Sequence, residues 1–381
     1  MVLSIIIRWS LILLLGLSIH VETAALNSTV QRLNAQPDNE RNVPLVFRSS
    51  TKTPIITTVL NPYRARDHII NPHNFSYILN PEYTVCGQNS SDVYLFVYVH
   101  SGPTNYQRRA IIRETWAMRA IFPDIRLVFM IGKTLDKTIT KAIMYENELY
   151  HDIVQEDFID SYKNLSYKGV MALKWISKYC PNTNYILKVD DDIVVNMFTL
   201  INHLKFLDKH NPNRTGTILC LLWSAMGVMR DSKSKWYLSK EDFPYDKFPP
   251  YCSGSAFVLT GDMSWKMYNA SLYVPFFWVD DYYITGAVAS AANVTYAQLG
   301  SLYTIPQQLA HTRFMSTKSF YTIMFGHFPG SMNNMREIWR RILSYQLYKF
   351  PQRYSQLSNS LMWDEKVPWT DVFIKNLQKK K

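Results

Sequence analysis

Apolar and polar positions alternate in blocks along the middle of the chain, between about residue 91 and residue 190. Short runs rich in β-branched and aromatic residues are typical of buried strands, and longer segments with helical spacing lie between them. Strands are expected over residues 92–100, 126–131, 153–158 and 184–189, and helices over 107–119, 138–150 and 162–179. This alternation predicts an α/β fold with a mostly parallel central sheet flanked by helices.

The second half of the chain has a less regular pattern. Strands are expected over residues 217–225 and 255–260, and helices over 261–270, 280–292 and 336–347. The segment 236–251 is rich in aromatic residues and proline. We expect this half to complete the sheet.

Residues 1–21 form a hydrophobic segment with one positive charge, Arg8, and the segment ends before Glu22. Its length is compatible with one helix across a bilayer if Arg8 reaches the interface, and its charge distribution leaves the N-terminus in the cytosol. A cleaved signal peptide is the alternative, because Thr23 and Ala25 offer small residues for a processing site.

Seven N-glycosylation sequons follow this segment, which favours a luminal chain. They are Asn27, Asn74, Asn89, Asn164, Asn213, Asn269 and Asn293. The four cysteines are too widely spaced for a CxxC metal motif. They fit one or two disulfides in an oxidising compartment, with three complete connectivities, and they also fit free buried thiols.

The chain of 381 residues is 47% hydrophobic and carries a formal net charge of +11. Such a charge suits nucleic acid, the phosphates of a nucleotide or anionic lipid. The positive residues are scattered and no nucleic-acid-binding motif accompanies them, so we expect no nucleic-acid partner.

Three consecutive aspartates, Asp190, Asp191 and Asp192, follow the strand expected at 184–189. Ligands of parallel sheets bind beyond the carboxyl ends of the strands. Adjacent carboxylates repel one another and need a cation or hydrogen-bond donors nearby. Mn²⁺ and Mg²⁺ prefer carboxylate oxygens and complete their shells with phosphate and water. A solvated turn is the alternative, because aspartate is common in turns.

Several separated blocks resemble glycosyltransferase family 31, the β-1,3-galactosyltransferase and β-1,3-N-acetylglucosaminyltransferase family. In order, they are RRAIIRETW (108–116), FMIG (129–132), EDFIDSYKNLSYKGVMALKW (156–175), YILKVDDDIVVN (185–196), KWYLS (235–239), PPYCSGSAFVLTGD (249–262) and VDDYYITG (279–286). Each block is weak alone, but the ordered set is specific. The resemblance implies a GT-A type nucleotide-sugar-binding fold, a UDP-sugar donor, Mn²⁺ or Mg²⁺, and inversion at the anomeric carbon.

The resemblance also implies which residues hold the metal. Asp190 and Asp192 bracket the family's D-x-D motif, with Asp192 as the direct ligand, while Asp191 is expected to face the donor sugar or its ribose. His327 resembles a histidine of the family's C-terminal stretch and is the further expected ligand. His311 is the alternative.

Five further assignments concern the nucleotide sugar. Arg109 and Arg113 lie four residues apart on one face of a helix, where they contact the diphosphate or pair with acidic neighbours. Lys188 is expected to pair with a carboxylate or to approach the nucleotide. Asp157 follows the family's acidic strand near the uridine or the sheet edge. Gly254 is expected to permit close backbone approach in the strand that lines the cleft.

Inverting transfer requires a base that takes the proton of the attacking hydroxyl. Asp281 aligns with the aspartate of the family's acidic pair and is the first candidate, with Asp280 as the second. Asp280 stands where many members carry glutamate, and Tyr282 replaces the usual valine. The alternative role is that of a helix N-cap, where aspartate is favoured in any case.

The resulting hypothesis is an inverting hexosyltransferase that moves galactose from UDP-galactose in β-1,3 linkage onto a glycoprotein or glycolipid glycan. Transfer of N-acetylglucosamine or N-acetylgalactosamine is one alternative, and a catalytically silent luminal glycan-binding relative is another. The expected organisation is an anchor in the Golgi membrane (1–21), a stem (22–90) whose last part packs on the domain, a single luminal catalytic domain (91–350) and a C-terminal extension (351–381). This is a single-pass type II topology.

Overall fold

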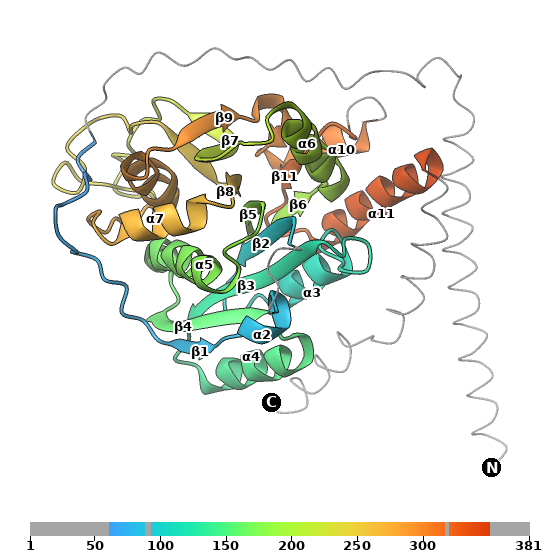
Figure 1. Ribbon diagram of the computed structural model, residues 1–381, viewed down its shortest axis with the longest axis horizontal. Coiled ribbons are helices and arrows are strands. Elements are labelled where there is room, and N and C mark those ends of the chain that lie inside the picture. The colour runs from blue at the N-terminus through green and yellow to red at the C-terminus, as the bar shows by residue number, and fades with distance from the viewer. Residues whose placement is uncertain (1–60, 88–92, 317–319, 351–381) are drawn as a thin grey trace. The chain divides into compact units, whose positions relative to one another are not determined.

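The computed structural model describes residues 61–87, 93–316 and 320–350 (Figure 1). Of these, residues 61–339 belong to one compact unit and residues 340–350 to a second. The first unit contains both sheets and every candidate site residue.

An eight-stranded sheet forms the centre of this unit, in the order β1-β4-β3-β2-β5-β8-β7-β9. The strands are β1 (Tyr77–Leu79), β2 (Leu95–His100), β3 (Ile125–Lys133), β4 (Ile153–Ile159), β5 (Tyr185–Asp190), β7 (Thr217–Trp223), β8 (Tyr251–Thr260) and β9 (Thr295–Gln298). The run β4-β3-β2-β5 is parallel, whereas β8 is antiparallel to both of its neighbours. The predicted α/β architecture, with a mostly parallel central sheet flanked by helices, is confirmed.

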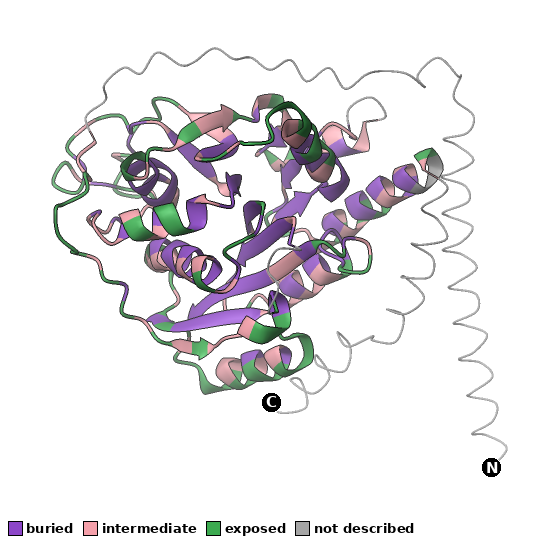
Figure 2. Ribbon diagram, viewed as in Figure 1, coloured by how far each residue is buried: buried purple, intermediate pink, exposed green. Residues whose placement is uncertain are grey.

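The inner strands β2, β3, β4, β5 and β8 are mostly buried because helices cover the sheet, as the purple ribbon of Figure 2 shows, whereas the edge strands β1 and β9 are partly exposed. The helices are α2 (Glu82–Val85), α3 (Tyr106–Glu114), α4 (Lys137–Tyr150), α5 (Leu165–Tyr179), α6 (Met197–His210), α7 (Met263–Ser271), α8 (Asp280–Tyr282), α9 (Ala289–Ala291), α10 (Gln307–Met315) and α11 (Met332–Lys349). Helix α5 packs against α7, β2 and β3. Its face carries Trp175, which is fully buried beside Phe96 of β2. Large buried rings of this kind supply much of the hydrophobic stabilisation of a domain.

Two expected helices differ in detail from the structure. The helix expected at 162–179 begins with a 3-10 turn (Tyr162–Asn164) before α5, and the helix expected at 280–292 contains a π-helical segment (Tyr283–Val288) between α8 and α9. Hydrophobic periodicity does not distinguish these helix types from one another, because the hydrogen-bond register changes while the apolar face persists.

A second, three-stranded sheet was not predicted. It contains β10 (Tyr303–Thr304), β11 (Phe325–His327) and β6 (Ile193–Val195). Strand β6 begins directly after Asp192 and pairs antiparallel with β11, which sets His327 opposite Ile193. Strands of two or three residues are too short to produce a recognisable alternation.

The described end of the expected stem, residues 61–87, packs on the domain. The backbone N–H groups of Arg66 and Ile70 donate to the carbonyls of Tyr273 and Leu272, and β1 pairs antiparallel with β4. The predicted segments 1–21 and 351–381 lie outside the described residues. Within residues 61–87, 93–316 and 320–350, no helix has the length and apolar character needed to cross a membrane.

All four cysteines are paired, Cys86 with Cys180 and Cys220 with Cys252. The first disulfide joins the stem end to the C-terminus of α5, and the second joins β7 to β8. Of the alternatives left open by the sequence, the structure therefore has two disulfides and no free thiol.

Candidate active site

The three aspartates lie where the strand direction of the sheet changes. Strand β5 is parallel to β2 on one side and antiparallel to β8 on the other, and Asp190 is its last residue. The backbone N–H of Asp191 donates to the carbonyl of His100 at the end of β2, over 3.2 Å. Ligands of open α/β sheets bind at such a topological switch point, so the predicted position of the cluster is supported by the fold.

Asp191 is held inside the protein. Its carboxylate accepts hydrogen bonds from Ser101 Oγ (2.7 Å), Asn105 Nδ2 (2.9 Å) and Arg108 Nη1 (2.8 Å), and its side chain is only 6% exposed. We call residues Asp190–Asp192 the aspartate turn. These hydrogen bonds connect it to the loop after β2 and to α3. Asp191 therefore positions the turn relative to the loop and α3, and its expected contact with the donor sugar or ribose stays a prediction.

The side chain of Asp192 is partly exposed and lies beside a histidine and an arginine. Its Oδ2 lies 3.4 Å from His327 Nε2 and 3.4 Å from Arg108 Nη1. Burial acts to raise the pKa of Asp192, but the hydrogen bond from His327 and the nearby positive charges outweigh it and lower the pKa. The same hydrogen bond raises the pKa of His327. The alternative histidine, His311, lies 3.9 Å from Glu337 instead.

Lys188 connects the aspartate turn to β8. Its side chain is buried, and its ammonium donates to Asp190 Oδ1 at 2.6 Å and to the carbonyl of Gly254. Of the two roles expected for Lys188, the structure has the pairing with a carboxylate. Burial raises the pKa of Asp190 to about 7 despite the opposing effect of Lys188.

The acidic pair, Asp280 and Asp281, lies beside β8, the strand whose Gly254 carbonyl accepts the hydrogen bond from Lys188. Asp280 and Asp281 begin α8, which packs against β8. A Cβ atom added to Gly254 would lie 2.8 Å from the Cβ of Asp281, so the glycine allows the backbone of β8 to approach this carboxylate. Burial, and then the charge of Asp280, raise the pKa of Asp281, and burial raises the pKa of Asp280.

The N-cap alternative for the acidic pair is not what the structure contains. The N-cap residue of α8 is Val279, with no side-chain capping bond, although Asp281 Oδ1 accepts the N–H of Tyr282 at 2.9 Å. The π-helical segment that follows is a rare conformation found frequently at functional sites.

Arg109 and Arg113 take the second of their two expected roles, pairing with acidic neighbours. Arg109 is fully buried and makes a bidentate contact with Glu146, while Arg113 binds Glu146 and Asp152. The Arg113 guanidinium also lies over the rings of Phe129 (4.6 Å) and Tyr150 (4.0 Å). The predicted diphosphate contact is not supported, because these guanidinium groups are satisfied inside the protein.

Arg108 was missed as a site residue, although it opens the first family block. It lies on α3 beside Arg109, and its side chain is 28% exposed next to Asp191 and Asp192. The available signal was helical geometry. Spacing of four residues places Arg109 and Arg113 on one face, so their neighbour Arg108 must point elsewhere.

Asp157 lies apart from the contacts described so far. It is exposed on β4 and accepts the backbone N–H of Ser76 at 3.1 Å, at the edge that β4 shares with β1. The adjacent Glu156 is buried between His73 and Lys174. Of the two positions expected for Asp157, near the uridine or at the sheet edge, the structure has the sheet edge.

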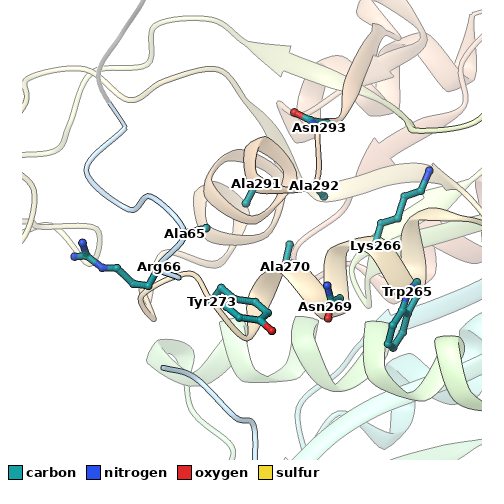
Figure 3. Close-up of a pocket in the computed structure, with 10 residues that line it drawn as sticks. All are labelled: Ala65, Arg66, Trp265, Lys266, Asn269, Ala270, Tyr273, Ala291, Ala292 and Asn293. Carbon is teal, nitrogen blue, oxygen red and sulfur yellow. The ribbon is translucent and has the colours of Figure 1, made fainter. Parts of the chain in front are cut away.

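A cavity of about 380 Å³ lies away from the aspartates, between α7 and the end of α9. Figure 3 shows its lining, which includes Trp265, Asn269, Tyr273 and Asn293. It contains none of the candidate catalytic or metal-binding residues. The carboxylate cluster, and not this cavity, is therefore the candidate active site.

Sequence comparison supports the motif assignment. The Galactosyltransferase family model matches residues 107–300, about half of the chain. Beta-1,3-galactosyltransferase 1 of Homo sapiens is 33% identical over 224 residues, which are 58% of this chain and 66% of that protein. Beta-1,3-galactosyltransferase 2 of Homo sapiens is 32% identical over 218 residues, which are 56% of this chain and 50% of that protein. The matched part thus spans half to about two thirds of these relatives.

Solved glycosyltransferase structures show a weaker overall likeness. A glycosyltransferase involved in glycosylation of the major capsid of PBCV-1 matches with a TM-score of 0.36 and 10% identity, over 64% of this chain and 98% of that one. The galactosyltransferase LgtC in complex with donor and acceptor sugar analogues has a TM-score of 0.34 and 11% identity, over 64% and 94%. Scores of this size add no argument, so the family rests on the sequence match. That match confirms the resemblance, and the chain belongs to the galactosyltransferase family, glycosyltransferase family 31.

Proposed function

We propose that this chain is an inverting hexosyltransferase that transfers galactose from UDP-galactose in β-1,3 linkage to a glycan acceptor on glycoprotein or glycolipid. Family membership supports the reaction class, and the relatives named β-1,3-galactosyltransferases favour galactose as the sugar.

The observation that carries the proposal is the proximity of two acidic groups, Asp190–Asp192 and the pair Asp280 and Asp281. Lys188 contacts both Asp190 and the carbonyl of Gly254, and Gly254 closely approaches Asp281. Carboxylates that are far apart in the sequence therefore meet where β5 and β8 lie side by side. One group is suited to the diphosphate end of the donor and the other to the acceptor hydroxyl.

Asp281 is the base in this proposal. The acceptor hydroxyl attacks the anomeric carbon from the face opposite the diphosphate, and Asp281 accepts the hydroxyl proton. The new bond forms between the acceptor oxygen and the anomeric carbon, while the bond to the β-phosphate oxygen breaks and its electron pair leaves with UDP. Asp280 supports this role, because its charge helps to raise the pKa of Asp281 and a base of higher pKa accepts a proton more readily.

Asp192, Asp190 and His327 fit a divalent cation such as Mn²⁺ or Mg²⁺. No group of three histidine, cysteine or acidic side chains within the described segments is gathered tightly enough to hold a metal alone. Two partly exposed carboxylates and an imidazole nevertheless suit an ion that takes only some of its ligands from protein. Such an ion supplies charge that stabilises the departing diphosphate. We assign the protein's own diphosphate contact to Arg108, whose guanidinium is partly exposed beside Asp192.

The test combines calorimetry with a donor screen on the purified protein. We expect UDP to bind in the presence of Mn²⁺, and we expect Asp192→Ala to abolish the metal-dependent part of the affinity. Asp67→Ala is the matched control, because the Asp67 carboxylate is 96% exposed and contacts only the neighbouring His68 among the ion pairs of the described residues. UDP binding that is unaffected by Asp192→Ala or by a chelator contradicts the metal assignment.

The screen compares UDP-galactose with UDP-N-acetylglucosamine and UDP-N-acetylgalactosamine. Preferential turnover of UDP-galactose is the expected result. Preference for an N-acetylhexosamine donor replaces the sugar assignment but keeps the reaction class. Binding of UDP without hydrolysis or transfer of any donor identifies a silent relative.

The same proposal includes a Golgi location with a type II topology and a luminal domain. Its support is the hydrophobic segment 1–21, the sequons and the two disulfides, because disulfides persist in oxidising compartments. Microscopy of the tagged full chain beside a Golgi marker, together with protease protection of a C-terminal tag in sealed vesicles, tests it. A tag that is digested without detergent contradicts the topology.

A further inference from the structure

Three aromatic side chains, two of them exposed and one half-buried, form a group that the proposed chemistry does not use. Tyr162 begins the 3-10 turn before α5, Trp236 lies in the KWYLS block, and Trp278 lies before α8. Trp236 Nε1 donates to the Tyr162 hydroxyl at 2.7 Å, and the ring centroids of Tyr162 and Trp278 are 6.4 Å apart. Tyr162 is 46% exposed and Trp236 is 48% exposed. We call these three residues the ring platform.

The ring platform adjoins the acidic pair. Trp278 lies two residues before Asp280, and the turn that holds Tyr162 leads into α5, which packs against α8. The electrostatics agree with this placement. Burial, and then the negative charges of Asp280 and Asp281, raise the pKa of Tyr162 to about 12. The platform therefore lies near the carboxylate assigned as the base.

Two lysines flank the platform. The Lys235 ammonium lies 4.4 Å from the ring centroid of Trp236 and 5.3 Å from that of Tyr162, and the Lys163 ammonium lies 5.4 Å from that of Trp278. Both lysines are exposed, and in the part of the chain that the structure describes neither makes an ion pair with a carboxylate. Lys168 and Lys188, by contrast, are buried and paired with Asp160 and Asp190.

Cation–π contact alone does not account for this arrangement. It contributes only about 0.5–1 kcal/mol at an exposed site. Exposed rings offer flat apolar area and hydrogen-bonding edges to a ligand, which is how most small-molecule sites are lined. Two unpaired cations beside such rings add attraction for negative charge. A sugar ring that stacks on the platform would thus bring an acidic substituent within reach of a lysine.

We propose that the ring platform is the acceptor subsite and that Lys163 and Lys235 select an acceptor glycan carrying an acidic group, a sulfate or a carboxylate. This inference rests on the proposed function, because it assumes that the acidic pair receives an acceptor hydroxyl. It assigns sugar stacking to Tyr162, Trp236 and Trp278 and charge selection to the two lysines. The donor side of the site is not involved.

The test measures acceptor binding directly, without requiring turnover. Tryptophan fluorescence of the purified full chain, with UDP and Mn²⁺ present, is titrated with three probes of equal size. The probes are a neutral disaccharide, its sulfate ester and a disaccharide that contains a uronic acid. We expect the charged probes to bind roughly tenfold more tightly than the neutral one, as expected for a charge-assisted contact. This preference should shrink as salt is raised.

Matched variants separate charge from stacking. The double variant K163Q/K235Q is expected to bind all three probes within about twofold of one another, while its affinity for the neutral probe stays that of the unaltered protein. Trp236→Ala is expected to weaken all three probes. Lys141→Gln and Trp265→Ala are the controls, because Lys141 is an exposed lysine on α4 and Trp265 is an exposed tryptophan that lines the separate cavity in Figure 3.

The outcomes separate this inference from the proposed function. Equal affinity for neutral and charged probes in the unaltered protein overturns the selection of an acidic acceptor. A preference that survives in K163Q/K235Q, or disappears in Lys141→Gln, overturns the assignment to these lysines. If the preference holds but no UDP-sugar is turned over, the proposed function fails and the subsite stands. Transfer of galactose with no preference for charge leaves the function intact and refutes the subsite.

Discussion

Helix α3 contributes arginines to two clusters of charge that differ in how completely they are neutralised. On one side, Arg109 and Arg113 bind Glu146 and Asp152, with every one of these side chains 14% exposed or less. On the other side, Arg108 meets the aspartate turn, where Asp192 is 20% and Asp190 is 38% exposed. The first cluster balances two positive charges against two negative ones. The second has three carboxylates against Arg108, Lys188 and, when protonated, His327.

This difference separates a structural network from a site. Buried charges whose partners are complete hold elements together and leave nothing for a ligand. Carboxylates that are crowded, partly exposed and incompletely paired favour a cation or a proton. The contrast favours ligand binding at the cluster with unsatisfied charge, although both clusters take their arginines from the same family block.

The largest expected effect is on catalysis, when the proposed base is removed. Asp281→Asn removes the group proposed to accept the proton while keeping the size of the side chain. We expect kcat to fall by roughly 10²–10⁴-fold, the usual contribution of general base catalysis. The affinity for UDP should stay the same, because the donor diphosphate is assigned to the aspartate turn. Steady-state kinetics together with calorimetry checks both parts, and activity within a few-fold of the unaltered protein refutes the role of Asp281.

The next effect compares the two clusters by stability. Glu146→Gln leaves the fully buried Arg109 without its charged partner, and we expect a loss of about 3–5 kcal/mol in the free energy of unfolding. Asp192→Asn removes a charge that His327 and Arg108 favour, but the side chain is 20% exposed, so we expect a loss in the free energy of unfolding clearly smaller than that of Glu146→Gln. Chemical denaturation of both variants measures the difference. Equal destabilisation by the two substitutions would contradict the distinction between a structural and a functional cluster.

A smaller effect is expected where β8 meets the acidic pair. In Gly254→Ala the new methyl group meets the Cβ of Asp281 at 2.8 Å, so the carboxylate or the strand has to shift. Overpacking of this kind costs about 1–3 kcal/mol of stability. We expect kcat to decrease more than the affinity for UDP, because the displaced group is the proposed base. Gly227→Ala is the control, since a Cβ there has no atom within 4 Å.

The smallest effect is on the pH dependence. Asp281 must be ionised to accept a proton, and its pKa is raised by burial and by Asp280, so kcat should fall as pH drops through a value well above that of an ordinary carboxyl group. Asp280→Asn removes the negative neighbour and lowers the pKa of Asp281. The acidic limb of the plot of kcat against pH should therefore move to lower pH by roughly one unit. A limb that stays in place or moves upward argues against coupling between the two carboxylates.

The strands and helices of the first half were predictable, because their apolar periodicity is strong and their aspartates directly follow a strand. The roles of individual charges were less predictable. The contacts of Asp191 with Ser101 and Asn105 were not predicted. Arg109 and Arg113 were expected to contact the diphosphate or to pair with acidic neighbours, and the structure has the second arrangement. Sequence spacing places side chains on a helix face, but it does not reveal that Glu146 lies opposite that face.

Local periodicity and ordered motifs are visible without knowledge of contacts, so they were enough to predict the fold class, the position of Asp190–Asp192 at the end of a central strand and the family. Which charges are satisfied depends on contacts in the folded protein. The tertiary structure set His327 beside Asp192 through a strand pair too short to recognise, and it joined the aspartate turn to Asp281 through Lys188 and Gly254. The reason is physical: neutralisation, burial and pKa depend on neighbours brought together by folding, and those neighbours are distant in the chain.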